Sequence, residues 1–154
     1  MKTVVIGLGN SYRRDDGVGV AAAEALNTLG LPDVRVVTDI AEPTSLLEAW
    51  SGAGLAVVID AVVATPSTPG RVRRSDPSQV VARDGLSSHG VDIARAHALG
   101  QALGLVPDEL VVFTIEVADT GNGIGMTPQV AGAVPEVVRL VVEEINRHHR
   151  ATNS

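Results

Sequence analysis

The fold is decided by the stretch Val4-Val5-Ile6-Gly7-Leu8-Gly9-Asn10 and by Asp15-Asp16-Gly17-Val18-Gly19, which follows it closely. The apolar run predicts a buried strand, and the glycines allow a sharp turn into a helix that begins near the aspartate pair. The two carboxylates are thereby delivered to the carboxyl end of the first strand. Ligands bind at this edge in open α/β sheets.

Strand and helix patterns alternate along the rest of the 154 residues, without a linker or an internal repeat. Strands are predicted at 3–8, 34–38, 55–63 and 109–117, with a short additional strand at 71–74. Helices are predicted at 16–29, 44–51, 90–103 and from Thr127-Pro128 to about residue 149, with Thr127 as N-cap and Pro128 as the first helical residue. This alternation of strands and helices predicts one α/β domain over 1–154, a three-layer sandwich whose mostly parallel, twisted sheet of about five strands carries helices on both faces.

Composition excludes several classes of function. Hydrophobic residues make up 45% of the chain and aromatic residues only 2%, which is typical of a parallel sheet covered by helices. The net charge of −6 argues against a nucleic-acid surface. The absence of cysteine excludes disulfides, zinc–thiolate sites, iron–sulfur clusters and thiol nucleophiles. Because neither a signal peptide nor a membrane-length apolar run occurs, we expect a cytoplasmic protein that does not contact membranes.

Asp60 is expected to end the buried strand that contains Leu55-Ala56-Val57-Val58-Ile59, and it is followed by another apolar run, Ala61-Val62-Val63. A carboxylate in such a place is costly unless it is paired, hydrogen-bonded or holding a metal. A functional role is therefore favoured over a capping or turn role. Glu116 ends the fourth long strand and is expected at the same edge of the sheet.

The aspartate pair allows a division of labour. Acidic residues at a helix start cap free N–H groups and complement the helix dipole. Because adjacent residues cannot share a helical face, we expect Asp15 to cap the helix and Asp16 to face the site.

The four histidines differ in their surroundings. His89 lies in Ser87-Ser88-His89-Gly90, at a predicted helix mouth, and is a candidate metal ligand. His97 lies within an Ala-rich helix and is expected to pack, whereas His148 and His149 are expected to be solvated at the polar end of the last helix. The carboxylates of Asp16 and Asp60 and the imidazole of His89 would suit a divalent metal or hydrolytic acid–base chemistry.

Other enzyme signatures are missing. A dinucleotide fingerprint needs a third glycine after Gly7-Leu8-Gly9, where the chain has Tyr12, and the aspartate pair would repel a pyrophosphate. Neither the G-x-S-x-G elbow of serine hydrolases nor the H-E-x-x-H zinc motif occurs.

Several motifs, in order along nearly the whole chain, resemble the hydrogenase maturation endopeptidases: Gly7-Leu8-Gly9-Asn10, Asp15-Asp16-Gly17-Val18-Gly19, Ile59-Asp60-Ala61, Ser88-His89-Gly90 and Gly125-Met126-Thr127-Pro128. The resemblance implies an aspartic-type, nickel-dependent peptidase. Its partner would be the precursor of a nickel–iron hydrogenase large subunit, from which it removes a C-terminal extension after nickel insertion. Asp16, Asp60 and His89 would be the catalytic set and would contact the precursor's nickel, so that Ni²⁺ arrives with the substrate and is not permanently bound.

One segment departs from the family pattern. After its second strand the family usually shows an Asp-Gly-Gly-Thr-like segment linked to substrate recognition, whereas this chain reads Asp39-Ile40-Ala41-Glu42-Pro43-Thr44. Asp39 and Glu116 are expected to contribute to recognition of the precursor, and the protein is expected to be a monomer.

Two alternatives stay open from the sequence. The altered segment at 39–44 supports a metal-responsive chaperone that holds the precursor without cutting it. A peptidyl-tRNA hydrolase also opens with a strand and a Gly-Leu-(Gly or Ala)-Asn turn, but it needs a histidine soon after that turn. No histidine precedes His89, and an acidic surface opposes tRNA binding.

Overall fold

The computed structural model describes residues 2–9, 14–40, 42–63, 66, 68–75, 93–117 and 125–152. In chain order its strands are β1 Thr3–Gly7, β2 Val34–Val37, β3 Leu55–Val62, β4 Val72–Ser75 and β5 Glu109–Glu116. Its helices are η1, a 3₁₀ turn at Arg14–Gly17, then α1 Val18–Thr28, α2 Pro43–Trp50, α4 Ile93–Leu103 and α5 Pro128–Thr152. The elements agree with the predicted ones to within a few residues at each end.

The strands form a five-stranded sheet in the order β2-β1-β3-β5-β4. Neighbouring strands from β2 to β5 are parallel, and β4 pairs antiparallel with β5 at one edge. The prediction of a mostly parallel sheet with helices on both faces is confirmed. The strand order and the reversed direction of β4 are new findings of the structure.

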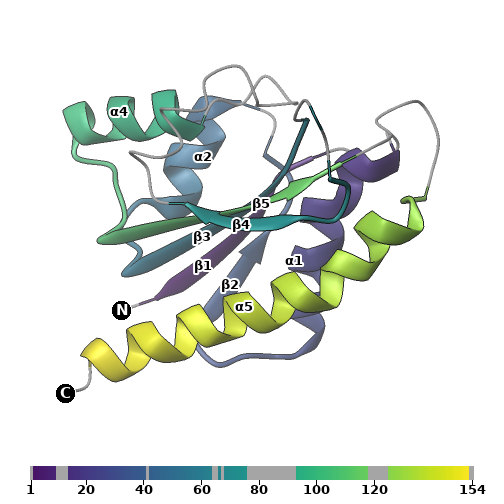
Figure 1. Ribbon diagram of the computed structural model, residues 1–154. Coiled ribbons are helices and arrows are strands. Elements are labelled where there is room, and N and C mark those ends of the chain that lie inside the picture. The colour runs from purple at the N-terminus through teal and green to yellow at the C-terminus, as the bar shows by residue number, and fades with distance from the viewer. Residues whose placement is uncertain are drawn as a thin grey trace.

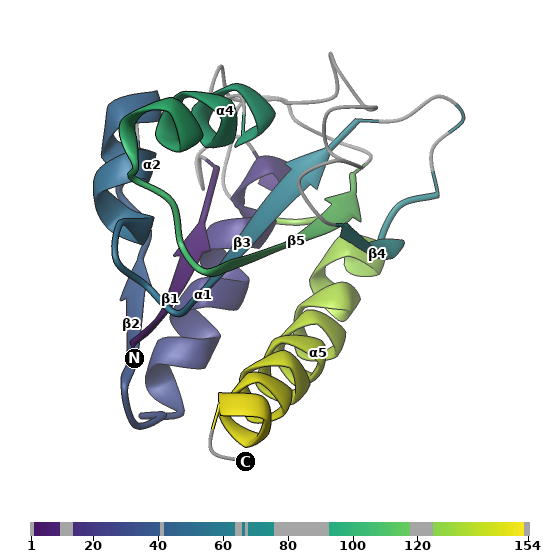
Figure 2. The same ribbon diagram turned by 90° about the vertical axis from the view of Figure 1, so that its left-hand side faces the viewer.

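Helices cover the sheet in two pairs, with α1 and α5 on one face and α2 and α4 on the other (Figures 1 and 2). The strand residues divide between the faces by simple alternation, as successive side chains on a strand must. Val57, Ile59, Val111 and Phe113 pack with α1 and α5, while Ala56, Val58, Leu110 and Val112 pack with α2 and α4. The same alternation determines which polar side chains share a face of the sheet.

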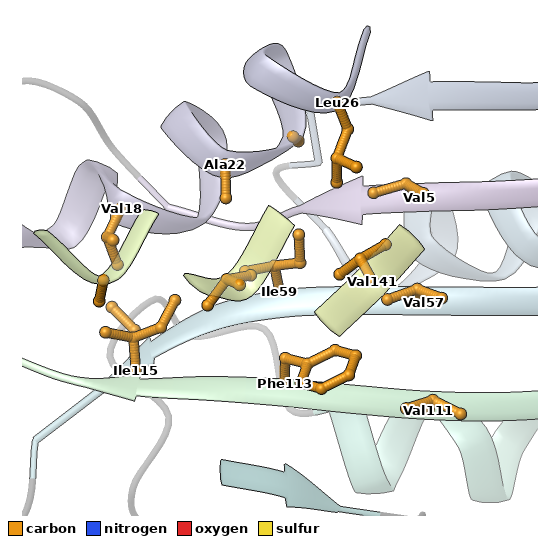
Figure 3. Packing of buried hydrophobic residues seen from close by; sticks show 14 of the residues in the cluster. Val5, Val18, Ala22, Leu26, Val57, Ile59, Val111, Phe113, Ile115 and Val141 are labelled. Carbon is orange, nitrogen blue, oxygen red and sulfur yellow. The ribbon is translucent and has the colours of Figure 1, made fainter. Parts of the chain in front are cut away.

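Aliphatic side chains fill the core between the sheet and the α1–α5 pair (Figure 3). Ile59 and Phe113 of the sheet lie opposite Val18 and Ala22 of α1 and Val141 of α5, and all five are buried. Burying such a side chain contributes about 1.5–3 kcal/mol. Trp50 is fully buried and donates its indole N–H to the Leu105 carbonyl at 3.0 Å.

Gly19 sets how closely α1 approaches the sheet. A Cβ atom at this position would lie 2.5 Å from both the Ile59 and the Leu8 carbonyl oxygens. Only glycine therefore allows the first turn of α1 to rest on the carboxyl ends of β1 and β3. The turn η1, which directly precedes α1, is brought to the same edge.

The C-terminal half of α5 is held at the opposite, amino-terminal edge by ionic contacts. Glu144 is bonded by Arg74 of β4 and, at 2.7 Å and 3.2 Å, by Nη2 and Nε of Arg147. Arg147 also donates to Glu109 at 2.7 Å. Burial would raise the pKa of Glu144, but the bonds and charges of its two arginines outweigh burial and hold that pKa below its ordinary value.

Within the described residues, no helix combines the length and the apolar character that crossing a membrane requires.

Candidate functional site

Asp60 lies within the central strand β3 rather than at its end, because β3 continues to Val62. The residue is only 2% exposed. By strand alternation its side chain shares the face of Ala56 and Val58, which pack with α2 and α4. The predicted burial of a carboxylate in the most apolar strand is therefore confirmed, although its role is a separate question.

Asp16 reaches the same edge through η1. Gly19 packs against the carbonyl of Ile59, the residue directly before Asp60. Since Asp16 lies three residues before Gly19, its backbone lies at the carboxyl end of β3, which η1 contacts. The side chain of Asp16 lies outside what the structure describes.

Asp15 has a structural role, but its partner differs from the predicted one. Helix α1 has Gly17 as N-cap and receives no side-chain cap. Asp15, fully buried, instead accepts the backbone N–H of Thr127 at 2.7 Å and contacts the Thr127 hydroxyl at 3.1 Å and 3.2 Å. The prediction that Asp15 caps its own helix was wrong. Asp15 instead binds the residue that precedes α5, the helix that begins at Pro128 as predicted.

Glu116 ends β5 and is also buried, with its side chain 6% exposed. Its Oε1 accepts the Thr68 N–H at 3.3 Å, and its Oε2 has no hydrogen-bond partner among the described residues. The nearest cations in the described part of the chain are Nε of Arg71 at 3.7 Å and Nε of Arg73 at 3.9 Å, both beyond hydrogen-bond distance. A buried carboxylate thus retains one unsatisfied oxygen.

One row of the sheet joins Asp60 to this region. Asp60 is the register partner of Thr114 in β5, and Thr114 is the partner of Arg73 in β4. The Thr114 hydroxyl is buried and finds no hydrogen-bond partner in the described ranges. Sequence analysis did not single out Thr114; the available signal was the spacing of two between Thr114 and Glu116 in an otherwise apolar strand.

The remaining predicted site residues are less informative. His89 lies outside the described residues. Asp39 follows β2 and is exposed. No group of three or more His, Cys, Asp or Glu side chains in the described part of the chain could hold a metal ion. The convergence of Asp16, Asp60 and His89 therefore stays a prediction.

Two other histidines can be assigned. His97 lies edge-on to Trp50, with ring centroids 6.1 Å apart, and burial lowers its pKa. It packs, as predicted. His148 was expected to be solvated and is not: it is 8% exposed, and its Nδ1 lies 3.2 Å from a Glu109 carboxylate oxygen. The reason is that α5 lays this face of its last turns against the start of β5.

The carboxyl edge of the sheet therefore combines buried acidic groups with arginines. Such carboxylates can ligate a hard or borderline cation or accept a proton from water. The partly exposed arginines of β4 and the residue before it can bind an anion. This inventory fits hydrolysis of a polar substrate better than chemistry in an apolar pocket.

Comparisons with known proteins agree with this geometry. A model of the hydrogenase maturation protease family matches residues 20–144. The hydrogenase expression/formation protein HupD of Rhodobacter capsulatus is 27% identical over 151 residues, which cover 94% of this chain and 71% of HupD. The hydrogenase 2 maturation protease of Escherichia coli is 24% identical over 146 residues, covering 92% of this chain and 89% of that protein.

Solved structures show the same fold. The hydrogenase maturating endopeptidase HybD from Escherichia coli superposes with a TM-score of 0.85 at 22% identity, covering 96% of this chain and 93% of HybD. The [NiFe] hydrogenase maturation protease HybD from Thermococcus kodakarensis has a TM-score of 0.79 at 21% identity, covering 93% and 98%. The family match extends over most of the chain, and the protein belongs to the hydrogenase maturation proteases.

Proposed function

We propose that this protein is an endopeptidase that removes the C-terminal extension of a nickel–iron hydrogenase large-subunit precursor once nickel has been inserted. Membership of the hydrogenase maturation proteases supports the peptidase activity and the class of substrate. The observation that carries the proposal is Asp60, a carboxylate buried in the central strand beside the helix start that carries Asp16.

In this proposal the nickel belongs to the substrate. Asp16, Asp60 and His89 supply two carboxylates and one imidazole, a set that suits Ni²⁺ and leaves coordination positions for ligands from the precursor. In this proposal the three side chains alone do not retain Ni²⁺ and ligands of the precursor complete its coordination, so the enzyme gains affinity for the precursor only when nickel is already there. Cleavage would then wait for metal insertion.

The chemical step is hydrolysis of one peptide bond. Water adds to the scissile carbonyl, the C–N bond breaks, and the products are a new C-terminal carboxylate and the amine of the released extension. Either a carboxylate acts as base toward the water or the metal polarises the carbonyl. Asp60 is central to both routes.

The test is intact-mass spectrometry of the precursor after incubation with the purified protein, with and without nickel. We expect a shortened C-terminus only in the nickel-loaded sample. A stable complex of unchanged mass would instead identify a chaperone, and undiminished cleavage of nickel-free precursor would refute the role of the metal.

Asp60→Asn is the matching variant. We expect processing to slow by at least about 100-fold, because even an outer-shell partner of a metal ligand contributes about 10- to 100-fold. Asp108→Asn makes the same chemical change at an exposed position just before β5, at the opposite edge of the sheet, and should leave the rate unchanged. Wild-type rates in Asp60→Asn would remove Asp60 from the mechanism.

A further inference from the structure

We propose that Arg71 and Arg73 form a binding site for a carboxylate of the substrate peptide, and that Glu116 holds the two guanidinium groups in position. The proposal rests on the function proposed above, since it assigns part of the substrate to a part of the same edge. The carboxylate is either the C-terminal one of the extension or an acidic side chain near the scissile bond.

The two arginines are accessible to a ligand, since their side chains are 53% and 38% exposed. Within the described residues, the ion-pair partner of each is Glu116, at 3.7 Å from Nε of Arg71 and 3.9 Å from Nε of Arg73. Both contacts exceed 3.5 Å, so no hydrogen bond is made. Each guanidinium can therefore offer its N–H groups to a ligand, and a carboxylate matches this fork with two parallel bonds.

A second buried glutamate, Glu144, is fully hydrogen-bonded by its arginines, unlike Glu116. Glu144 is also buried beside two arginines, and there Arg147 approaches to 2.7 Å and Arg74 is hydrogen-bonded as well. Where this chain builds a structural ion cluster, it closes the hydrogen bonds. At Glu116 it leaves a buried oxygen without a partner in the part of the chain that the structure describes, which is the arrangement of a cluster that can accept a further group.

Arg73 lies near Asp60 on the same face of the sheet. Asp60, Thr114 and Arg73 occupy one row across three adjacent strands and so share one face. Two steps between strands put the Cα atoms of Asp60 and Arg73 about 10 Å apart, which is about three residues of extended peptide. A carboxylate bound by the arginines would therefore belong to a residue a short distance from the bond being cleaved. Thr114, whose hydroxyl has no hydrogen-bond partner among the described residues, lies between them.

The backbone at Arg71 is held in place by contacts with β5 and α5. Arg71 follows Gly70, whose N–H donates to the Glu116 carbonyl at 2.8 Å, and the Glu116 N–H donates to the Arg71 carbonyl at 2.9 Å. Gly70 has a φ of +90°, and a Cβ there would lie 2.4 Å from the Gln129 carbonyl in α5. The backbone that carries Arg71 is thus fixed between the end of β5 and the start of α5.

Charge explains why such a site is needed. The chain carries 18 acidic and 12 basic residues, and Asp15, Asp60 and Glu116 are all buried at this edge. A substrate carboxylate approaching the edge would be repelled unless cations met it. Counting only Glu116 and the two guanidinium groups 3.7 Å and 3.9 Å from it, the local charge is +1, and this local positive charge is what a substrate carboxylate would meet.

Binding can be tested without cleavage. The probes are N-acetyl-pentaalanine with a free terminal carboxylate, its C-terminal amide, and an amidated version with glutamate as the central residue. The readout is the NMR signals of the Nε–H groups of Arg71 and Arg73. We expect one or both carboxylate-bearing peptides to shift these signals, and the difference between the two identifies the source of the carboxylate. Equal shifts with the neutral amide, or no shifts with any probe, would overturn the proposal.

Cleavage of the nickel-loaded precursor gives the second test. We expect the double variant Arg71→Gln, Arg73→Gln to raise KM by about tenfold, as loss of charge-assisted hydrogen bonds predicts, with kcat unchanged. Arg139→Gln is the control, since Arg139 is 61% exposed and pairs with Glu143 on α5. Neutralising the carboxylates of the extension should raise KM for the wild type and not for the double variant.

The two proposals fail separately. If the wild type cleaves the precursor and the double variant does so with the same KM, the carboxylate site is wrong while the peptidase stands. If the wild type does not cleave, the proposed function is wrong, and the peptide titration still decides whether the arginines bind a carboxylate.

Discussion

Glu144 and Glu116 are both buried glutamates with two arginine neighbours, but they lie on opposite faces of the sheet. On the face covered by α1 and α5, Arg74 and Arg147 bond Glu144 directly. On the other face, at the end of β5, the nearest described arginine nitrogen lies 3.7 Å from Glu116, and one carboxylate oxygen has no hydrogen-bond partner among the described residues. The same residue types are thus closed in one place and open in the other.

The difference between the two clusters indicates that the one at Glu144 stabilises the fold and that the one at Glu116 can bind a ligand. A satisfied ion cluster binds α5 to the sheet, whereas unsatisfied buried groups cost free energy and persist only where something else requires them. Variants at the two glutamates should therefore separate stability from activity.

The largest effect is expected at Gly19, where the carboxyl edge would be broken outright. In Gly19→Ala the added methyl meets two carbonyl oxygens at 2.5 Å, so α1 must move away from the strand ends. We expect the free energy of unfolding, measured with urea, to fall by about 3 kcal/mol, and precursor processing to be lost. Gly132→Ala is the control: nothing lies within 4 Å of its added Cβ, and the exposed helix should gain up to about 1 kcal/mol. Equal stability of the two variants would contradict the close packing.

Glu144→Gln opens the closed cluster. Loss of its charge weakens the bonds from two arginines, and we expect the free energy of unfolding to fall by about 2 kcal/mol while the KM and kcat for the precursor stay the same. Glu143→Gln, next to it but with its side chain 60% exposed, should change stability by less than about 0.5 kcal/mol. A large change in KM for Glu144→Gln would show that the Glu144 cluster also affects substrate binding.

Acid should open the same cluster in the wild type. The pKa of Glu144 is below its ordinary value of 4.5 in the folded protein, so its stabilising contribution is present above about pH 4.5 and is lost as the pH falls through the lowered pKa. We expect the stability difference between wild type and Glu144→Gln to shrink as the pH is lowered from 7 toward 3. Urea unfolding at several pH values measures it, and a difference that stayed constant would argue against the assigned bonds.

The smallest effect on stability is expected for Glu116→Gln. The amide keeps an oxygen for the Thr68 N–H, and no hydrogen bond from a described residue to Oε2 is broken, since Oε2 receives none from them. We expect the free energy of unfolding to stay within about 0.5 kcal/mol of the wild type, while KM rises and kcat is unchanged. If Glu116→Gln destabilised the protein as much as Glu144→Gln, the open cluster would be a structural ion pair like the other one.

Local patterns predicted much of this fold. The apolar runs at 55–63 and 109–117 appear as β3 and β5, and Pro128 begins α5 as expected, because periodicity and capping depend on neighbouring residues. Asp60 could be recognised as a buried carboxylate for the same reason. The prediction for 71–74 located β4 within one residue, but its antiparallel pairing depends on a partner about 40 residues away and was not accessible.

What the sequence by itself determined is the class of fold, the position of its elements and the family to which the chain belongs. Only the tertiary structure decided that Asp15 binds Thr127, 112 residues away, and that His148 is buried beside Glu109. It also decided that Thr114 and Arg73 stand in the row of Asp60. The physical reason is that secondary structure follows from interactions along the chain, whereas the partner of a buried polar group is set by whichever distant element packs against it.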